Sequence, residues 1–202
     1  RSKRGARDMR PETRDLSVRR TVFGFSTLHR MRRILVTGAA TRMGGRIIQQ
    51  LERVPDTEVF AVDDLDPIER FTSRFERLDI DDLSFARYFL DLKPHTVVHL
   101  QTVDRSALHG ATRAHEESTV GAQALFGAIG RCTTVRHVVV KSDGAVYGAG
   151  PRSPSVVTVD SKLERSGGRY QRDLEQMELF VRDTAERHDH VDYTILRLAP
   201  IF

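Results

Sequence analysis

The stretch RILVTGAATRMGG, residues 33–45, decides the fold of this chain. Its first five residues form a short apolar run that ends at a glycine, which is typical of a buried strand. From Gly45 to Arg53 the apolar residues recur at helical spacing, so we expect a helix there. Gly38 allows a tight turn, Gly44 allows close packing of helix on strand, and the free N–H groups that start the helix suit a phosphate. The stretch therefore predicts a pyrophosphate site; a plain strand–helix turn is the alternative.

The rest of the body alternates between strands and helices. Short apolar runs predict further strands, and apolar residues at helical spacing predict further helices. The expected strands are 58–62, 74–78, 96–100, 135–142 and 191–198, and the expected helices are 83–92 with Asp82 as N-cap, 113–130 and 170–188. Such alternation predicts an α/β fold, a Rossmann-type doubly wound parallel sheet with its ligand crevice at the carboxyl ends of the strands. The long Gly, Pro and Ser-rich stretch 149–169 is expected to lie on the substrate side of that crevice.

Acidic residues follow the second and third expected strands. Asp63 comes 25 residues after Gly38. An acidic residue at about this spacing accepts hydrogen bonds from a ribose and repels a 2′-phosphate, which favours NAD over NADP. Asp64 is a nearby substitute, and a solvated strand end is the alternative. Asp79 and Ile80 end the third strand, where an adenine edge is expected.

The charge of the chain is unevenly distributed. The 202 residues carry a net charge of +4, but residues 1–30 hold nine Lys and Arg against three acids, so the body is slightly acidic. This distribution argues against nucleic-acid binding by the body. We expect residues 1–30 to be a disordered basic leader, with a transit-type segment and upstream sequence outside the working protein as alternatives, and residues 31–202 to be the Rossmann domain. The apolar end Leu198–Phe202 predicts a chain cut before its C-terminal substrate lobe.

Composition excludes several classes of protein. No apolar run approaches the roughly 20 residues that span a membrane. A single cysteine, Cys132, excludes an internal disulfide and a cysteine-based metal cluster, and it favours a cytoplasmic setting. His188 and His190 lack the spacing of a helical metal site, so we expect no metal. His99 is expected to be a hydrogen-bonded core residue.

Several motifs in order resemble the extended short-chain dehydrogenase/reductases, namely the NAD-dependent epimerase/dehydratase family that includes UDP-glucose 4-epimerase. The matching pieces are residues 34–45, 61–63, 78–80, 97–100, 142–148, Tyr170 and 195–199. The resemblance implies bound NAD and a nucleotide-sugar-like substrate, and a homodimer is a possible assembly. The cofactor-binding positions that we expect are Gly38, Thr41, Arg42, Met43, Gly44, Asp63, Asp64, Asp79, Ile80, Leu100 and Gln101.

The chain departs from this family where the resemblance places catalysis. The family pattern is Tyr-x-x-x-Lys, but Tyr170 is followed at the fourth place by Leu174. The family Ser or Thr falls on Asp143, beside Ser142. A tyrosine has a pKa of about 10, so only about one in a thousand is ionised at pH 7 unless a nearby cation lowers that pKa. Leu174 cannot do so, and Lys141 is a distant candidate for the missing charge.

The sequence therefore leaves two candidate functions. The first is an oxidoreductase or isomerase of the epimerase/dehydratase type, with Tyr170, Asp143 and Ser142 as its candidate catalytic residues. The second is a catalytically degenerate NAD-binding module with a structural, sensing or partner-binding role. The glycine stretch and Asp63 support both, whereas Leu174 and Asp143 favour the second.

Overall fold

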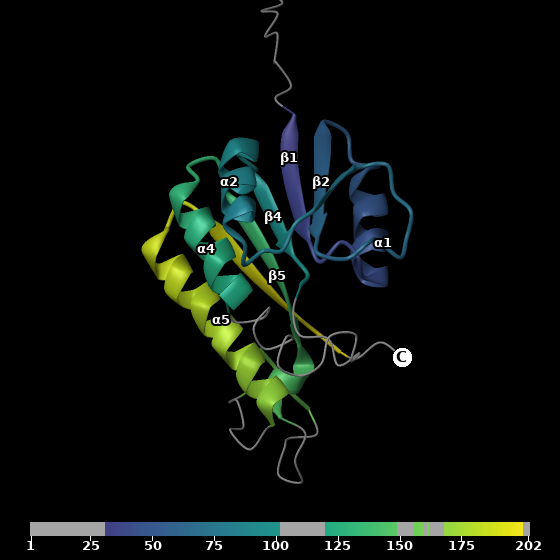
Figure 1. Ribbon diagram of the computed structural model, residues 1–202. Helices are drawn as coiled ribbons and strands as arrows, with labels where there is room; N and C mark the ends of the chain where they lie inside the picture. Colours follow the sequence, from purple (N-terminus) through teal and green to yellow (C-terminus); the bar gives the residue numbers. More distant parts are fainter. Residues whose placement is uncertain (1–30, 102–119, 149–155, 160, 162–167, 200–202) are drawn as a thin grey trace, which may run out of the picture.

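Six parallel strands form one sheet at the centre of the molecule (Figure 1). The computed structural model describes residues 31–101, 120–148, 156–159, 161 and 168–199. In spatial order the strands are β3-β2-β1-β4-β5-β6. Their bounds are β1 Arg32–Thr37, β2 Thr57–Asp63, β3 Arg74–Arg77, β4 Thr96–His99, β5 His137–Asp143 and β6 Asp192–Leu198. The order runs outward from β1 in both directions, so the strand order reverses between β1 and β4, and this reversal is where doubly wound sheets bind ligands.

Helices cover both faces of the sheet, but unequally. Helices α2 (Leu83–Leu92), α4 (Ala122–Arg131) and α5 (Arg169–Arg187) lie on one face, and α1 (Arg42–Leu51) lies on the other (Figure 1). The larger core cluster joins the three helices to the sheet and contains Phe85, Phe89, Leu125, Val138, Val140 and Leu174. A smaller cluster beneath α1 contains Val36, Ile48 and Ala61. The expected α/β doubly wound fold is confirmed.

Local sequence explains where helices begin and end. The Asp82 carboxylate accepts a hydrogen bond from Ser84 N at 2.7 Å and caps α2 as expected. Lys93, with φ of 52°, closes the same helix directly before Pro94. The expected helix 113–130 corresponds to α4, Ala122–Arg131, and the start expected at 113 lies outside the described residues. The leader 1–30 and most of 149–169 also lie outside them.

The connection between β2 and β3, residues 64–73, has no helix in it. Instead, polar contacts fasten this connection to α1. Gln49 Nε2 donates to the Arg70 carbonyl at 2.8 Å, and the Glu52 carboxylate accepts from Thr72 N and Ser73 N at 2.6 Å each. The connection therefore lies along α1 and returns the chain to the sheet edge beside β2.

No helix within the described residues is long and apolar enough to cross a membrane.

Candidate functional site

Two glycines shape the turn from β1 into α1, and neither tolerates a side chain. Gly38 has φ of 78°, and a Cβ there would lie 2.6 Å from Gln101 N and 2.7 Å from the Leu100 carbonyl carbon. A Cβ on Gly44 would collide with the Gly38 carbonyl oxygen. Both glycines are needed because backbone from β1, α1 and the end of β4 meets here. This is the close packing that a phosphate-binding turn requires.

Thr41 lies between the two glycines of that turn and caps the helix. Its hydroxyl donates to the Gly38 carbonyl at 3.0 Å and accepts from Gly44 N at 3.0 Å. The hydroxyl proton is thus used inside the turn. Arg42 and Met43 form the first turn of α1, where backbone N–H groups have no intrahelical partner and favour an anion.

Asp63, at the end of β2, is buried and holds the phosphate turn. Its side chain accepts from Ala40 N at 2.8 Å and from Leu65 N at 3.2 Å, and only 5% of the residue is exposed. Burial raises the pKa of Asp63 to about 6, and the Asp64 carboxyl adds to this rise. Asp63, the expected ribose partner, therefore also links β2 to the glycine turn by hydrogen bonds, a role that its spacing from Gly38 did not reveal.

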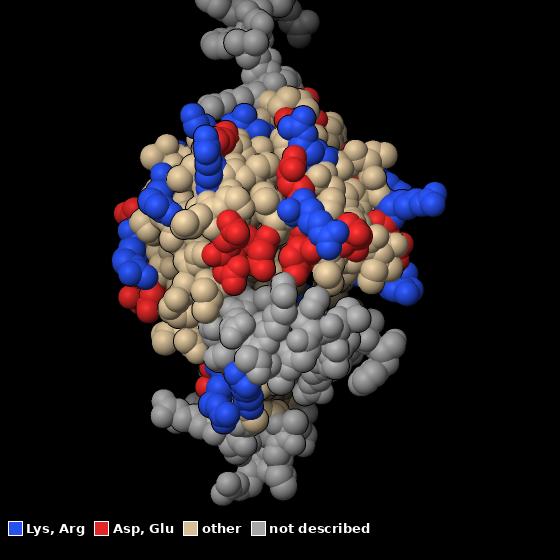
Figure 2. Space-filling view, in the orientation of Figure 1, with Lys and Arg blue, Asp and Glu red and all other residues tan. Residues whose placement is uncertain are grey.

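Acidic side chains gather on one face near this strand end (Figure 2). Burial raises the pKa of Asp79, and the neighbouring carboxyls of Asp81 and Asp64 raise it further. Ile80, expected near an adenine, is fully buried in the larger core, with its side chain packed against Gly121. The site is electronegative where a ribose is expected.

Leu100 and Gln101 follow β4 and close the turn from the other side. Leu100 packs in the smaller core cluster, and the Gln101 backbone lies against Gly38. The Gln101 Oε1 atom is buried and has no hydrogen-bond partner among the described residues. This acceptor, together with the glycine turn and the start of α1, fits a dinucleotide that offers hydrogen-bond donors and phosphates.

The candidate catalytic residues lie at the end of β5 and the start of α5. Ser142 is fully buried, and its hydroxyl donates to Glu178 at 2.7 Å. Asp143 accepts from Ala145 N at 2.7 Å and so caps the short 3-10 helix Gly144–Tyr147. Tyr170, in the first turn of α5, is partly buried against the larger core. Leu174 is 2% exposed in that core, so this position of α5 is used for apolar packing.

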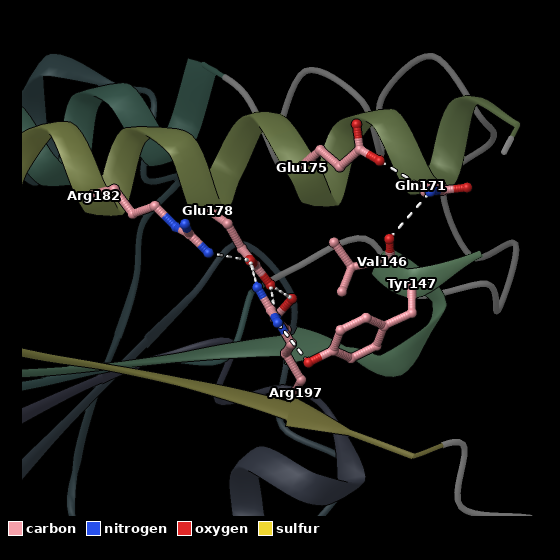
Figure 3. A network of polar contacts seen from close by, with 8 residues as sticks. Val146, Tyr147, Gln171, Glu175, Glu178, Arg182 and Arg197 are labelled. Atoms are coloured by element: carbon pink, nitrogen blue, oxygen red, sulfur yellow. Dashed lines mark hydrogen bonds and ion pairs between the residues drawn. The ribbon is translucent and has the colours of Figure 1, made fainter. Parts of the chain in front are cut away.

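A network of polar contacts holds these elements together (Figure 3). Arg197 of β6 binds both Glu178 oxygens, at 2.9 and 2.6 Å, and donates to the Tyr147 hydroxyl at 2.6 Å. The hydrogen bonds to Glu178 and Tyr147 raise the pKa of Arg197. Gln171 Nε2 donates to the Val146 carbonyl at 3.1 Å. Sequence reasoning gave Arg197 and Gln171 no role, and the order of elements alone could not show that they meet.

The remaining sequence expectations concern His99, Lys141 and metals. His99 is fully buried, and its Nδ1 lies 2.7 Å from the Thr37 hydroxyl, which confirms a hydrogen-bonded core residue. Burial lowers the pKa of His99 to about 4, with a smaller contribution from Lys141. Residues alternate along β5, so Lys141 points to the sheet face opposite Ser142 and α5. Within the described ranges no cluster of His, Cys, Asp and Glu suits a metal ion.

Comparisons with known proteins give matches over most of the chain. A curated protein named only as uncharacterized, from Mycobacterium tuberculosis (strain ATCC 25618 / H37Rv), is 34% identical over 174 residues, which are 82% of this chain and 46% of that protein. A Mycobacterium bovis protein matches to the same extent. This chain therefore spans about half the length of the curated relatives it matches.

Solved structures share the fold. UDP-glucuronic acid 4-epimerase from Bacillus cereus, in complex with UDP-glucuronic acid and NAD, matches with a TM-score of 0.68 and 20% identity over 82% of this chain and 55% of that chain. A short-chain dehydrogenase/reductase superfamily protein from Agrobacterium tumefaciens with bound NAD matches with a TM-score of 0.69 and 24% identity over 82% and 48%.

The family model "NAD dependent epimerase/dehydratase family" matches residues 34–202, which include the glycine turn, Asp63 and the ends of β5 and β6. The chain belongs to the NAD-dependent epimerase/dehydratase family.

Proposed function

We propose that this chain is the dinucleotide-binding part of an oxidoreductase or isomerase that binds NAD(H) and acts on a nucleotide-sugar-like substrate. The observation that carries the proposal is the turn at Gly38 and Gly44, where two Cβ positions are closed by backbone and a helix begins. Family membership and the NAD complexes of the structural neighbours support it.

Each part of the site has a role in this proposal. The N–H groups at Arg42 and Met43 bind the pyrophosphate, and Asp63 or Asp64 accepts from the adenosine ribose. Gln101 Oε1, buried beside the turn, accepts a hydrogen bond from the cofactor. When bound, NAD supplies a hydride acceptor for an alcohol carbon of the substrate. Tyr170, Ser142 and Asp143 are the candidate residues for the accompanying proton.

Glycine variants provide the sharpest test of the cofactor site. The full-length protein should be purified, its bound nucleotide identified by mass spectrometry, and NAD affinity measured by calorimetry after the nucleotide is removed. We expect Gly38→Ala to abolish detectable NAD binding, because its Cβ would clash with Gln101 N. Gly127→Ala is the matched control, since a Cβ at Gly127 has no neighbour within 4 Å among the residues that the structure describes. Equal NAD affinity in both variants would contradict the proposed site.

A second candidate function is a catalytically degenerate module that binds NAD without turnover. The burial of Leu174 favours it, because the family lysine has no counterpart at that position. The two candidates differ in one measurement. In an enzyme a nucleotide-sugar reduces the bound NAD within a turnover, transiently if the net reaction is an isomerisation, and absorbance at the wavelength characteristic of NADH rises. In a binding module the NAD stays oxidised.

We also propose a cytoplasmic homodimer. The buried single cysteine, Cys132, suits a reducing compartment. A groove of about 440 Å³ lies between α4 and α5, and its lining includes Phe126, Gly127, Gly130 and Phe180. A second copy seated there is supported by the exposure of Leu179, at 56%, on α5. Light scattering after size-exclusion chromatography tests this; we expect Gly127→Glu to give monomers, and a monomeric unmodified protein would contradict it.

A further inference from the structure

Among the described residues, Asp143 has an acceptor oxygen that no hydrogen bond uses, at the carboxyl end of β5. Its Oδ1 accepts from Ala145 N at 2.7 Å, and no described residue bonds its second oxygen. Beside it, a Cβ on Gly144 would meet, among the described residues, only the Leu198 carbonyl oxygen, at 3.6 Å. Within the described part of the chain, Asp143 therefore offers an unused acceptor oxygen at the carboxyl end of β5, next to an uncrowded glycine.

The other two candidates are less available for proton transfer. The Ser142 hydroxyl is fully buried and gives its proton to Glu178 at 2.7 Å. Tyr170 precedes Leu174, whose side chain lies in the core, so the helix brings no cation at that position to favour a phenolate. The Asp143 carboxylate, by contrast, keeps an acceptor oxygen that no described residue uses.

The segment that carries Asp143 is held on both sides. On one side Ser142 is bonded to Glu178, and on the other the Val146 carbonyl accepts from Gln171 at 3.1 Å. Beyond Val146, the Tyr147 hydroxyl accepts from Arg197 at 2.6 Å. Glu178 and Gln171 are 2% and 4% exposed, so these contacts are buried away from water. Proton transfer requires a group held within hydrogen-bond reach of the substrate. These contacts hold the backbone on both sides of Asp143 in place.

We infer that the Asp143 carboxylate takes the proton from the substrate hydroxyl that is oxidised, in the place of the tyrosine of the family pattern. This inference rests on the proposed function. In the step, the substrate C–H bond breaks and its electron pair leaves as hydride to the bound nicotinamide dinucleotide. The carbon–oxygen single bond becomes a ketone, and the O–H proton moves to Asp143. The reacting group of the proposed nucleotide-sugar-like substrate is thus a secondary alcohol, since an ionised carboxylate accepts from a hydroxyl but cannot donate to a carbonyl.

Single-turnover kinetics on the full-length protein test this assignment. NAD-loaded protein is mixed with a panel of UDP-sugars and dTDP-sugars, and NADH formation is followed by absorbance. Calorimetry gives the affinity for the same sugars, and thermal melting reports the fold. The variants are Asp143→Asn and Asp143→Ser, which both keep a cap for the 3-10 helix, with Tyr170→Phe beside them. Asp192→Asn, whose carboxylate is 82% exposed at the opposite end of the sheet, is the matched control.

We expect both Asp143 variants to reduce NAD at least ~100-fold more slowly, as is typical when a general base is removed. Their affinity for the sugar and their melting temperature should stay close to those of the unmodified protein. Asp192→Asn should change the rate by less than ~3-fold, and Tyr170→Phe should slow it less than either Asp143 variant does. A faster Asp143→Ser variant, or a large loss confined to Tyr170→Phe, would overturn the assignment. So would NAD-loaded protein that no sugar reduces, whereas protein that binds no dinucleotide would refute the proposed function itself.

Discussion

Asp63 couples the cofactor site to the stability of the fold, and replacing it with asparagine should make this visible. In the folded protein burial raises the pKa of Asp63 from 3.8 to about 6. The unfolded chain releases this proton near the lower value, so between the two values the folded state binds more protons. Stability therefore falls as pH rises from about 4 to 6 and is constant above.

The size of this effect follows from the shift. A rise of about two pKa units corresponds to ~3 kcal/mol at pH values above both. The amide of an Asp63→Asn variant would keep an oxygen for Ala40 N but lose the bond from Leu65 N, which costs ~1 kcal/mol. We therefore expect Asp63→Asn to be ~2 kcal/mol more stable than the unmodified protein near pH 8 and slightly less stable near pH 4.

Urea unfolding followed by circular dichroism, repeated across this pH range, measures the difference. Asp91→Asn is the control, because Asp91 is exposed on α2 and should change stability by less than ~0.5 kcal/mol at any pH. A difference between Asp63→Asn and the unmodified protein that does not vary with pH would refute the reasoning. So would a variant that is less stable at pH 8.

Three further predictions concern stability. Leu174→Lys should lower the free energy of unfolding by ~3 kcal/mol, because it places an ammonium group at a position that is 2% exposed. Leu174→Met should lower it by less than ~1.5 kcal/mol. Equal melting temperatures of the two variants would contradict the burial of this position. Arg197→Met should cost ~3 kcal/mol in urea unfolding, because the buried Glu178 would keep only the Ser142 hydroxyl and a 3.9 Å contact with Arg182, and adding Glu178→Met should restore part of it; a neutral single variant would count against this. His99 has a pKa near 6.5 in the unfolded chain but about 4 in the folded protein, so the free energy of unfolding decreases as pH falls between these values. In acid titrations His99→Asn should remove this decrease, whereas the control His190→Asn should leave it in place.

The sequence predicted the fold well because its signals are local. Apolar runs and helical spacing depend on neighbours in the chain, and the N-cap Asp82 needs only the two residues that follow it. The glycine turn was also readable, since Gly38 and Gly44 are close in sequence and the structure closes both Cβ positions.

The site was only partly predictable, because its contacts depend on strand register and side-chain direction. Adjacent residues on β5 face opposite sides, so Ser142 reaches Glu178 while Asp143 does not. Arg197 meets Tyr147 across 50 residues of sequence, and no local pattern indicates this pairing. Asp63 was expected as a ribose partner from its spacing, but its bond to Ala40 N needed the folded turn to be seen.

The helix-free connection between β2 and β3 affects how easily proteases cleave the native protein. Cleavage requires a segment of about ten residues to detach and enter the enzyme as an extended chain, which is why irregular loops are usually cut first. Here the Glu52 carboxylate holds Thr72 N and Ser73 N, and Gln49 holds the Arg70 carbonyl. Detaching residues 64–73 would break these bonds together, so Arg70 and Arg74 should resist trypsin in the native protein although no helix protects them.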